Sequence, residues 1–233
     1  MRVKPISITK PLSIDGLTSK EVDRMTSEQL IVYIARVSNS DNQLNLETGP
    51  KLLKFLINNK HWSPFEMVDF TVEVVTSRGI AQQILRHRSF SFQEFSQRYA
   101  EVTDFEEVQL RKAGATNRQS SLEEFNPMLP LYPATEVAAA QLIEMHLQDS
   151  EKLYKKLLDA GVAKECARFV LPITTQTKIY MKGSIRSWIH YLQIRTDEHT
   201  QLEHRLIALA IQNLFIQYFP DISEALLLKN NNE

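Results

Sequence analysis

A short segment in the first half of the chain concentrates side chains that bind anions. Residues 86 to 98 hold three arginines, one histidine and three serines, beginning with Arg86-His87-Arg88 and ending with Ser96-Gln97-Arg98. An arginine guanidinium binds a phosphate group with two parallel hydrogen bonds, and serine hydroxyls add uncharged donors. The segment therefore predicts a site for a nucleotide phosphate or a pyrophosphate.

The residues just before this segment extend the same prediction. Gln83 stands one helical turn before Arg86, so both side chains are expected on the same side of a short helix. The Gln83 amide could contact a base edge or a ribose. A second interpretation is a solvated basic turn that binds nothing, and composition alone leaves both interpretations open.

The bulk composition limits the partners that such a segment can serve. The chain has 233 residues and a formal net charge of −1, so it creates no overall field that attracts nucleic acid or an anionic membrane. A nucleic-acid-binding module is an alternative, but it would need a broader basic surface. The chain has one cysteine, Cys166, and no run of roughly 18 apolar residues. We therefore expect a soluble cytoplasmic protein in a reducing compartment, without a nucleic-acid or membrane partner.

The hydrophobic pattern predicts an α+β fold, a single domain over residues 1–233 in which helices surround a small, mostly antiparallel sheet. Helices are expected from Thr26 to about Ser38, after Thr48-Gly49-Pro50, after the capping residue Ser77, and over about 135–160, 164–170, 182–194 and 198–218. Alternating residues predict a strand over 69–77, and the chain is expected to return as a strand over 98–103. No element is expected over residues 1–25, and residues 104–134 are predicted to be a mobile excursion.

The order of residues in the basic segment is similar to a known family signature. The run R86-H-R-S-F-S-F-Q-E-F-S-Q-R98 resembles the signature of flavin-dependent thymidylate synthases at every fixed position. Four further segments resemble the same family in the same order: Ala35-Arg36-Val37-Ser38, His61-Trp62-Ser63-Pro64-Phe65-Glu66, Ala167-Arg168-Phe169-Val170-Leu171-Pro172, and Ile185-Arg186-Ser187-Trp188 through Arg195 and His199. The resemblance spans about Ala35 to Arg205.

This resemblance implies a homotetramer whose active sites are shared between subunits. The residues that it assigns to FAD are Ser38, Ser63, Arg86, His87, Arg88, Glu94, Ser184, Arg186, His190 and His199. Those that it assigns to dUMP are Gln83, Arg86, Glu94, Ser96, Gln97, Arg98, Arg168 and Arg195. The residues expected to be catalytic are Arg195, Ser96 and His61, with His61 near the flavin ring and the folate entrance. At Ser184 this chain departs from the family, which commonly has an asparagine there.

The activity that the resemblance implies is the reductive methylation of dUMP to dTMP, a step of de novo dTMP biosynthesis. It would use 5,10-methylenetetrahydrofolate as carbon donor, and FAD reduced by NADPH as the source of the hydride. Two alternatives are a degenerate relative that keeps the fold without turnover and a flavoprotein that acts on another substrate. The intact Arg-His-Arg and Ser-x-Arg positions argue against the first, and the complete set of dUMP-side residues argues against the second.

Each of these residues also has a purely structural interpretation. Taken alone, His61 reads as a loop histidine and Arg168 as the partner of a surface carboxylate. His190 and His199 are expected on different helices without a partner at metal-ligand spacing, so no metal site is predicted. Cys166 lies outside every nucleotide motif and is expected to be a small buried side chain, which leaves no cysteine to attack uracil.

Overall fold

The structure is a computed structural model that describes residues 1–102, 104–114, 121–132 and 135–229. Its strands are β1 (Arg2–Ile8), β2 (Asp69–Ser77), β3 (Ser91–Glu94), β4 (Arg111–Ala113), β5 (Ser121–Glu124), β6 (Met128–Tyr132), β7 (Thr135–Ala138) and β8 (Gln176–Ser184). Its α-helices are α1 (Ser19–Arg24), α2 (Ser27–Ala35), α3 (Gly49–Asn58), α4 (Arg78–Ile84), α5 (Ala139–Asp159), α6 (Lys164–Ala167), α7 (Ile185–Arg195), α8 (Leu202–Tyr218) and α9 (Pro220–Ala225). Short 3-10 helices are η1 (Ser40–Asn42), η2 (Ser63–Glu66) and η3 (Arg168–Val170).

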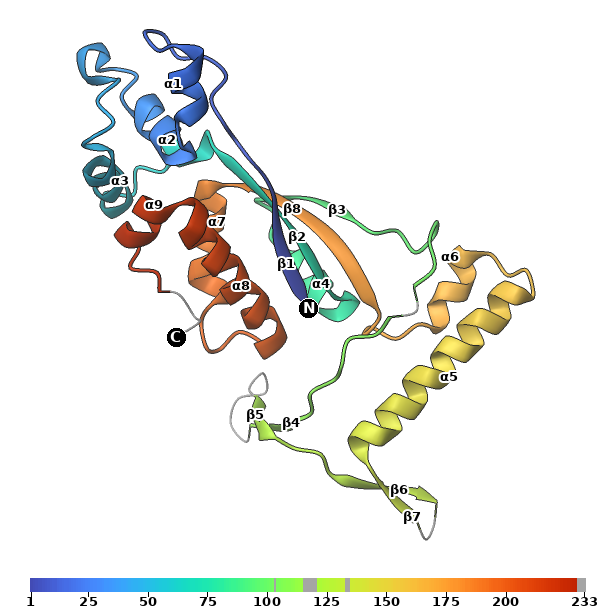
Figure 1. The fold of residues 1–233 in the computed structure, drawn as a ribbon. Coiled ribbons are helices and arrows are strands. Elements are labelled where there is room, and N and C mark those ends of the chain that lie inside the picture. Colours follow the sequence, from blue (N-terminus) through green and yellow to red (C-terminus); the bar gives the residue numbers. More distant parts are fainter. Residues whose placement is uncertain (103, 115–120, 133–134, 230–233) are drawn as a thin grey trace.

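A four-stranded antiparallel sheet with the order β1-β2-β8-β3 forms the centre of the fold (Figure 1). Strands β2 and β8 pair over their whole lengths, from Asp69 opposite Ser184 to Ser77 opposite Gln176. Phe70, Val72 and Val74 alternate along β2 and are buried against the helices. The predicted α+β class, the antiparallel sheet and the strand over residues 69–77 are therefore confirmed.

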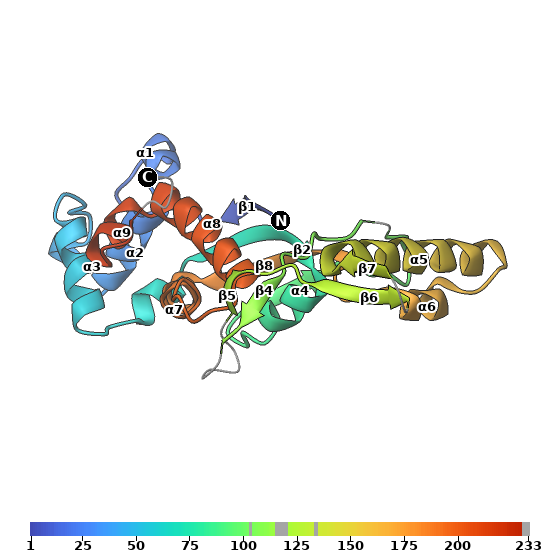
Figure 2. The ribbon, with the colours of Figure 1, turned by 90° about the horizontal axis from the view of Figure 1, so that it is seen from below.

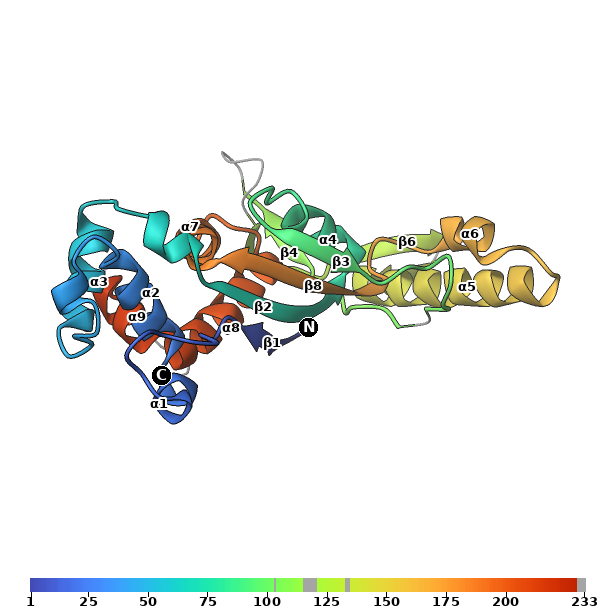
Figure 3. The same cartoon turned by 90° about the horizontal axis from the view of Figure 1, so that it is seen from above.

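The helices gather at two ends of this sheet. Figures 1 to 3 show α1, α2, α3 and α9 at one end, and α5 with α6 projecting at the other. Helices α7 and α8 pack together beside the sheet, where the Trp188 indole donates a hydrogen bond to the Phe70 carbonyl at 2.9 Å. Trp188, Phe70 and Phe219 are almost fully buried, so this aromatic cluster joins α7 and the C-terminal helices to β2.

Several helix boundaries confirm the capping residues read from the sequence. Thr26 accepts a hydrogen bond from the backbone of Gln29, whose side chain in turn accepts one from the backbone of Thr26, so a capping box begins α2 at the residue where the sequence predicted a helix. The Ser77 hydroxyl accepts one from the backbone of Ile80 at the start of α4. Gly161 has a φ of 83°, which allows the chain to leave α5 in a left-handed turn.

Other predicted boundaries were wrong, because tertiary pairing overrides the local pattern. Residues 1–25, for which no element was expected, form β1 along the edge of β2 and then helix α1. Residues 98–102 form no strand, because the chain turns where the Ser96 carbonyl accepts hydrogen bonds from the backbones of Tyr99 and Ala100; Thr103 lies outside the described residues. Residues 182–184, expected as helix, complete β8. His199, expected on a helix, lies in the turn before α8.

The stretch between residues 104 and 138 contains more regular structure than its composition indicates. Strands β4 and β5 pair with each other, as do β6 and β7. The last of these strands takes the first residues of the expected 135–160 helix. Helix α5 begins at Ala139, because the Asn126 side chain accepts a hydrogen bond from the Ala140 backbone at 2.9 Å. The mobility expected for residues 104–134 stays a prediction.

Hydropathy separates the helices of this fold from membrane-spanning ones. Throughout the ranges that the structure describes, every helix is too short or too polar to cross a lipid bilayer.

Candidate functional site

The middle residue of Arg86-His87-Arg88 contacts the last residue of α7. The chain leaves α4 at Ile84, and the Nε atom of Arg195 donates a hydrogen bond to Nε2 of His87 at 2.9 Å. Burial lowers the pKa of His87 to about 4, and the positive charges of Arg195 and His190 act in the same direction. At neutral pH the His87 ring is therefore uncharged, and its Nε2 is free to accept. Arg86 and Arg88, on either side, are exposed.

Two buried residues that the sequence did not single out, Tyr191 and His204, pack next to His87. The Tyr191 ring stands edge-on to the His87 ring, with 4.9 Å between the ring centroids and 73° between the ring planes. The Tyr191 hydroxyl lies 3.1 Å from Nε2 of His204, and the other nitrogen of His204 lies 3.3 Å from the side-chain oxygen of Gln83. Gln83, expected near dUMP, is thus linked to the environment of His87. Tyr191 lies within the Ile185–His199 segment without a role assigned from sequence, and His204 lies outside every segment that resembles the family.

A cavity of about 390 Å³ lies beside α7 and contains residues expected to contact the flavin. Its lining includes Arg186 and His190 from α7, Ser89 from the basic segment, and Trp62. Arg186 also bonds Glu66 of η2 at 2.5 Å, which ties the His-x-Ser-Pro-Phe-Glu segment to α7. A guanidinium, hydroxyls and an imidazole at one cavity fit an anionic, aromatic ligand such as part of a flavin nucleotide.

Ser184 takes a structural role at the start of α7. Its hydroxyl accepts a hydrogen bond from the backbone of Ser187 at 3.3 Å and so caps α7. The Ser187 hydroxyl donates to the Ser89 carbonyl at 3.3 Å, which connects the start of α7 to the basic segment. Serine and asparagine are about equally good residues at a helix N-cap, so the departure from the family pattern preserves the cap.

The second half of the basic segment runs away from α7 toward α6. The Glu94 carboxylate accepts a hydrogen bond from the Thr177 hydroxyl at 3.0 Å and forms an ion pair with the Arg78 guanidinium at 3.4 Å. Beyond it, Ser96 turns the chain, Gln97 is buried, and the Arg98 guanidinium lies over the Tyr99 ring at 5.4 Å. An ion pair of 3.3 Å between Glu101 and Lys164 attaches this segment to α6.

Arg168, also expected near dUMP, lies at this same end of the molecule, next to α6. It follows α6, and its Nε atom donates a hydrogen bond to the Glu165 carbonyl at 3.2 Å. Its guanidinium lies over the Phe169 ring at 5.7 Å, and that ring is 82% exposed. The pairing with a surface carboxylate, considered from sequence, is thus replaced by a backbone contact and a ring contact.

The remaining predicted residues lie at the opposite end of the molecule, near α2 and α3, or in a surface turn. Ser38 and His61 are exposed near α2 and α3, and the His61 ring packs edge-on against Phe55. Ser63 begins η2. His199 bonds Asp197 at 2.8 Å, and this hydrogen bond raises the pKa of His199.

One chain therefore brings only part of the predicted site together. His87, Arg195 and Gln83 form one connected group, and Arg186 with His190 lines the neighbouring cavity. The elements that precede Ser38 and Arg168, α2 and α6, lie at opposite ends of the molecule in Figures 1 to 3.

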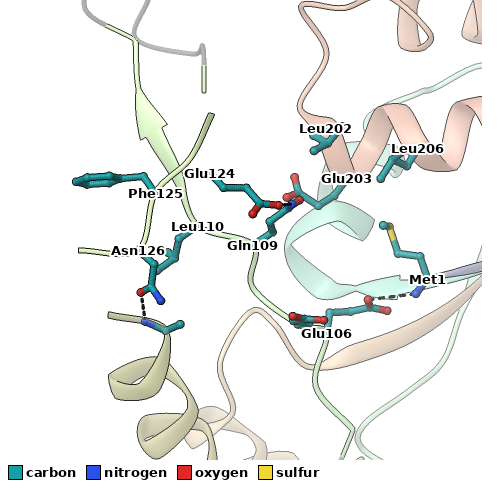
Figure 4. A pocket seen from close by; sticks show the side chains of 12 residues that line it. Met1, Glu106, Gln109, Leu110, Glu124, Phe125, Asn126, Leu202, Glu203 and Leu206 are labelled. Atoms are coloured by element: carbon teal, nitrogen blue, oxygen red, sulfur yellow. Dashed lines mark hydrogen bonds and ion pairs between the residues drawn. The ribbon is translucent and has the colours of Figure 1, made fainter. Parts of the chain in front are cut away.

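A larger cavity, of about 750 Å³, lies elsewhere and includes none of the predicted residues in its lining (Figure 4). It lies between α8 and the β4–β5 region, and its lining carries carboxylates from Glu106, Glu107, Glu124 and Glu203. Figure 4 shows the Met1 ammonium paired with Glu106, at 3.2 Å. Carboxylates repel phosphate groups, so this cavity is not the predicted anion site.

Two expectations about cysteine and metal chemistry can be compared with the structure. Cys166, expected to be buried, is exposed, because α6 has a single turn and the neighbouring Ala167 is the residue that faces inward. Considering only the described residues, no three His, Cys, Asp or Glu side chains are grouped so that they could hold a metal ion.

Comparisons with known proteins place this geometry in context. The family model described as "Thymidylate synthase complementing protein" matches residues 21–221. A flavin-dependent thymidylate synthase of Synechocystis sp. is 48% identical over 227 residues, covering 97% of this chain and 99% of the relative. A probable flavin-dependent thymidylate synthase of Paramecium bursaria Chlorella virus 1 is 49% identical over the same coverage.

A solved structure shares the fold at lower sequence identity. The crystal structure of a UMP/dUMP methylase, PolB, from Streptomyces cacaoi bound with 5-Br dUMP aligns with a TM-score of 0.73 and 24% identity. The alignment covers 97% of this chain and 94% of that chain. At this identity the likeness concerns the arrangement of helices and strands.

Proposed function

The chain belongs to the thymidylate synthase complementing protein family, the flavin-dependent thymidylate synthases, and on this premise we propose that it converts dUMP to dTMP. In this proposal 5,10-methylenetetrahydrofolate is the carbon donor, and bound FAD, reduced by NADPH, is the source of the hydride. Residues 1–233 act as one catalytic domain in the cytoplasm, which the single cysteine supports. The observation that carries the proposal is the contact of Arg195 with His87, the middle residue of the Arg-His-Arg that begins the family signature.

The residues of this chain supply binding and charge. The Nε group of Arg195 is engaged by His87, which directs the rest of the guanidinium, and the proposal assigns its Nη groups to the uracil ring. A fixed cation there stabilises the negative charge that develops on the pyrimidine when the ring is activated. Arg186, His190 and Ser89 hold the flavin at the cavity beside α7. Cys166 lies outside every segment that resembles the family signature, so the proposal assigns no step to a thiol.

A spectrum and a turnover assay test this function. The purified protein should show flavin absorption, or gain thermal stability when FAD is added. It should then oxidise NADPH in the presence of dUMP and methylenetetrahydrofolate and form dTMP. A folded protein that neither binds FAD nor forms dTMP would contradict the proposal.

We further propose that the protein is a homotetramer with shared active sites. Arg168 directly follows α6, which lies away from α7, the helix that ends at Arg195 (Figure 1), so a second chain would complete the nucleotide site. Met145 and Leu153 on α5 are 42% and 47% exposed, and Leu206 on α8 is 44% exposed. These apolar side chains support burial between copies of the chain.

Subunit mixing tests whether sites are shared. Arg168→Ala and Arg195→Ala should each be strongly impaired in dTMP formation, and co-expression of the two should restore part of the activity, because some sites then receive both arginines. Arg195→Ala mixed with His87→Ala is the matched control, since these residues touch within one chain and no hybrid site regains the pair. Light scattering should give four chains. A monomer that turns over dUMP, or no recovery in the first mixture, would contradict a shared site.

A further inference from the structure

His204 is a fully buried histidine whose two ring nitrogens are both engaged. It lies on α8 and is 0% exposed. Its Nε2 lies 3.1 Å from the Tyr191 hydroxyl, and its Nδ1 lies 3.3 Å from Oε1 of Gln83. The His204 ring also stands nearly perpendicular to the His87 ring, with 6.2 Å between centroids. A residue outside every motif therefore connects the nucleotide-side Gln83 with the surroundings of His87.

The direction of every hydrogen bond in this group follows from one carboxylate. Glu203 can only accept, so the Gln201 amide nitrogen faces it, at 2.9 Å. The Gln201 oxygen then accepts from the Gln83 amide nitrogen at 2.6 Å, which leaves the Gln83 oxygen facing His204. That oxygen can only accept, so Nδ1 of His204 carries the proton and Nε2 accepts from the Tyr191 hydroxyl.

The protonation states of two members of this series, Glu203 and His204, follow from their surroundings. Glu203 pairs with Arg111 at 2.5 Å. Burial alone would raise the pKa of Glu203, but the hydrogen bonds from Arg111, Gln201 and its own backbone, together with the charge of Arg111, lower it overall. Burial, together with the charges of Arg195 and His87, lowers the pKa of His204 to about 4, so its ring is neutral at physiological pH. A neutral ring with one donor and one acceptor is what the series of hydrogen bonds requires.

We propose that His204 is a positioning residue for dUMP that acts through Gln83, an inference that rests on the proposed function. With its oxygen held by His204 and its nitrogen held by Gln201, the Gln83 amide cannot rotate. It presents its second N–H and its second lone pair to the nucleotide in one orientation only. The same histidine holds Tyr191, the ring against which His87 packs. A histidine that merely fills the core would leave nucleotide affinity unchanged when replaced by an apolar side chain of similar size.

The test compares His204→Leu with the wild type in the FAD-loaded protein. His204→Leu removes both hydrogen bonds while keeping the volume, and it should raise the Kd of dUMP by about five- to tenfold. FAD content should stay unchanged, because no flavin contact is assigned to His204. His204→Gln can donate to Gln83 and accept from Tyr191, so it should recover most of the affinity.

Gln212→Leu is the matched control. Gln212 is a buried polar residue on the same helix, 6% exposed, whose amide donates to the Lys229 carbonyl at 2.9 Å. Its replacement should lower the thermal stability and leave the Kd of dUMP at the wild-type value. An equal rise in Kd for both variants would show a general structural effect and overturn the proposal.

A double-mutant cycle and a surface variant complete the test. If His204 acts through Gln83, then His204→Leu should have no further effect on dUMP binding in a Gln83→Ala background. Gln201 is exposed, so Gln201→Leu folds even if His204→Leu does not, and it should also raise the Kd several-fold. Unchanged dUMP affinity in folded His204→Leu or in Gln201→Leu, or full additivity in the cycle, would overturn the positioning role alone. A wild type that binds no dUMP would instead overturn the proposed function.

Discussion

The Nε atom of Arg195 lies 2.9 Å from Nε2 of His87 and donates a hydrogen bond to it. The contact joins the C-terminal end of α7 to the middle of the Arg-His-Arg segment, two parts of the chain 108 residues apart. It requires a neutral imidazole, which burial and the charge of Arg195 together provide by lowering the pKa of His87 to about 4. The pair thus fixes the guanidinium and the protonation state of the histidine at the same time.

Replacing Arg195 should change both the rate of dTMP formation and the pKa of His87. Arg195→Ala should lower the single-turnover rate of dTMP formation by about 10²–10³, the typical cost of losing one donor that stabilises developing charge. The pKa of His87 should rise, because one of the charges that lowers it is gone, while burial still holds it below 6.5. FAD content should be retained.

Arg195→Lys is the control for charge without shape. A lysine keeps the positive charge but lacks the planar fork, so it should restore part of the effect on the His87 pKa and only a little of the rate. Single-turnover dTMP formation at saturating dUMP measures the rate, and NMR titration of the imidazole measures the pKa. A FAD-loaded Arg195→Ala protein with a wild-type rate would remove Arg195 from the active site.

Cys166 should be reactive toward reagents and irrelevant to turnover. The thiol is exposed on the short helix α6, so iodoacetamide should label it in the folded protein. Cys166→Ala should remain active within a few-fold, because no step uses the thiol, and it should take up no label since the chain has one cysteine. Complete loss of dTMP formation in a folded, FAD-loaded variant would restore a thiol mechanism.

Gly183 on β8 leaves the space in which the Phe90 ring packs. A Cβ at Gly183 would meet the Phe90 ring at 2.4 Å, too close for any real contact. Phe90 is 8% exposed and packs edge-on against Trp188, with 4.7 Å between centroids, so it has little room to move. Gly183→Ala should therefore lower the free energy of unfolding by about 1–3 kcal/mol, measured by urea denaturation.

Gly79→Ala provides the comparison for this substitution. Its Cβ would make only ordinary contacts, the nearest at 3.5 Å to Ile173, and the residue lies in helix α4. An alanine in a helix is favoured over glycine by up to about 1 kcal/mol, so stability should rise or stay the same. Equal effects of the two substitutions would show that Phe90 moves away at no cost.

The sequence predicted those elements whose signal is local. The Thr26 capping box, the Ser77 cap and the alternation along β2 each depend on residues a few positions apart, and the structure has all three. Strand β1 could not be predicted in this way, because it exists through its pairing with β2, about 70 residues later. The four residues before α5 were read as helix because they suit one, but they pair with β6 instead.

The residues of the candidate site show the same contrast between local sequence patterns and contacts between distant parts of the chain. The Arg-His-Arg and Ser-x-Arg residues were predicted because the family signature fixes their order along the chain, and their roles stay predictions. His204 was missed because its role depends on contacts with Gln83 and Tyr191 across three helices, and its neighbours in the sequence carry no signal. The burial of Cys166 was predicted wrongly because residue type indicates an average burial, whereas a one-turn helix leaves only one side facing inward.

Glu28 should make the stability of the protein depend on pH. This residue of α2 is 3% exposed, and its carboxylate accepts a hydrogen bond from the Ile222 backbone at 2.8 Å at the start of α9. Burial raises its pKa from 4.5 to about 7, the charge of Asp221 adds to the rise, and the hydrogen bond from Ile222 only partly opposes it. The folded state therefore binds this proton more tightly than the unfolded state does.

The sign of the effect follows from this difference in proton affinity. As the pH rises from about 4.5 to about 7, the unfolded chain loses the proton first, so the contribution of Glu28 to the free energy of unfolding falls, and it levels off above pH 7. Glu28→Gln keeps the size and the acceptor oxygen without the charge. Its free energy of unfolding should nearly equal that of the wild type near pH 4.5 and exceed it by up to about 3 kcal/mol at pH 8.

Glu21→Gln is the control of opposite sign, because hydrogen bonds from Thr18 lower the pKa of Glu21. Removing the Glu21 carboxylate should therefore lower the free energy of unfolding more at pH 8 than at low pH. Urea denaturation at both pH values measures these differences. A gap between Glu28→Gln and the wild type that stays constant with pH would show that Glu28 does not titrate between 4.5 and 7, and that its hydrogen bond to α9 holds the carboxylate ionised despite burial.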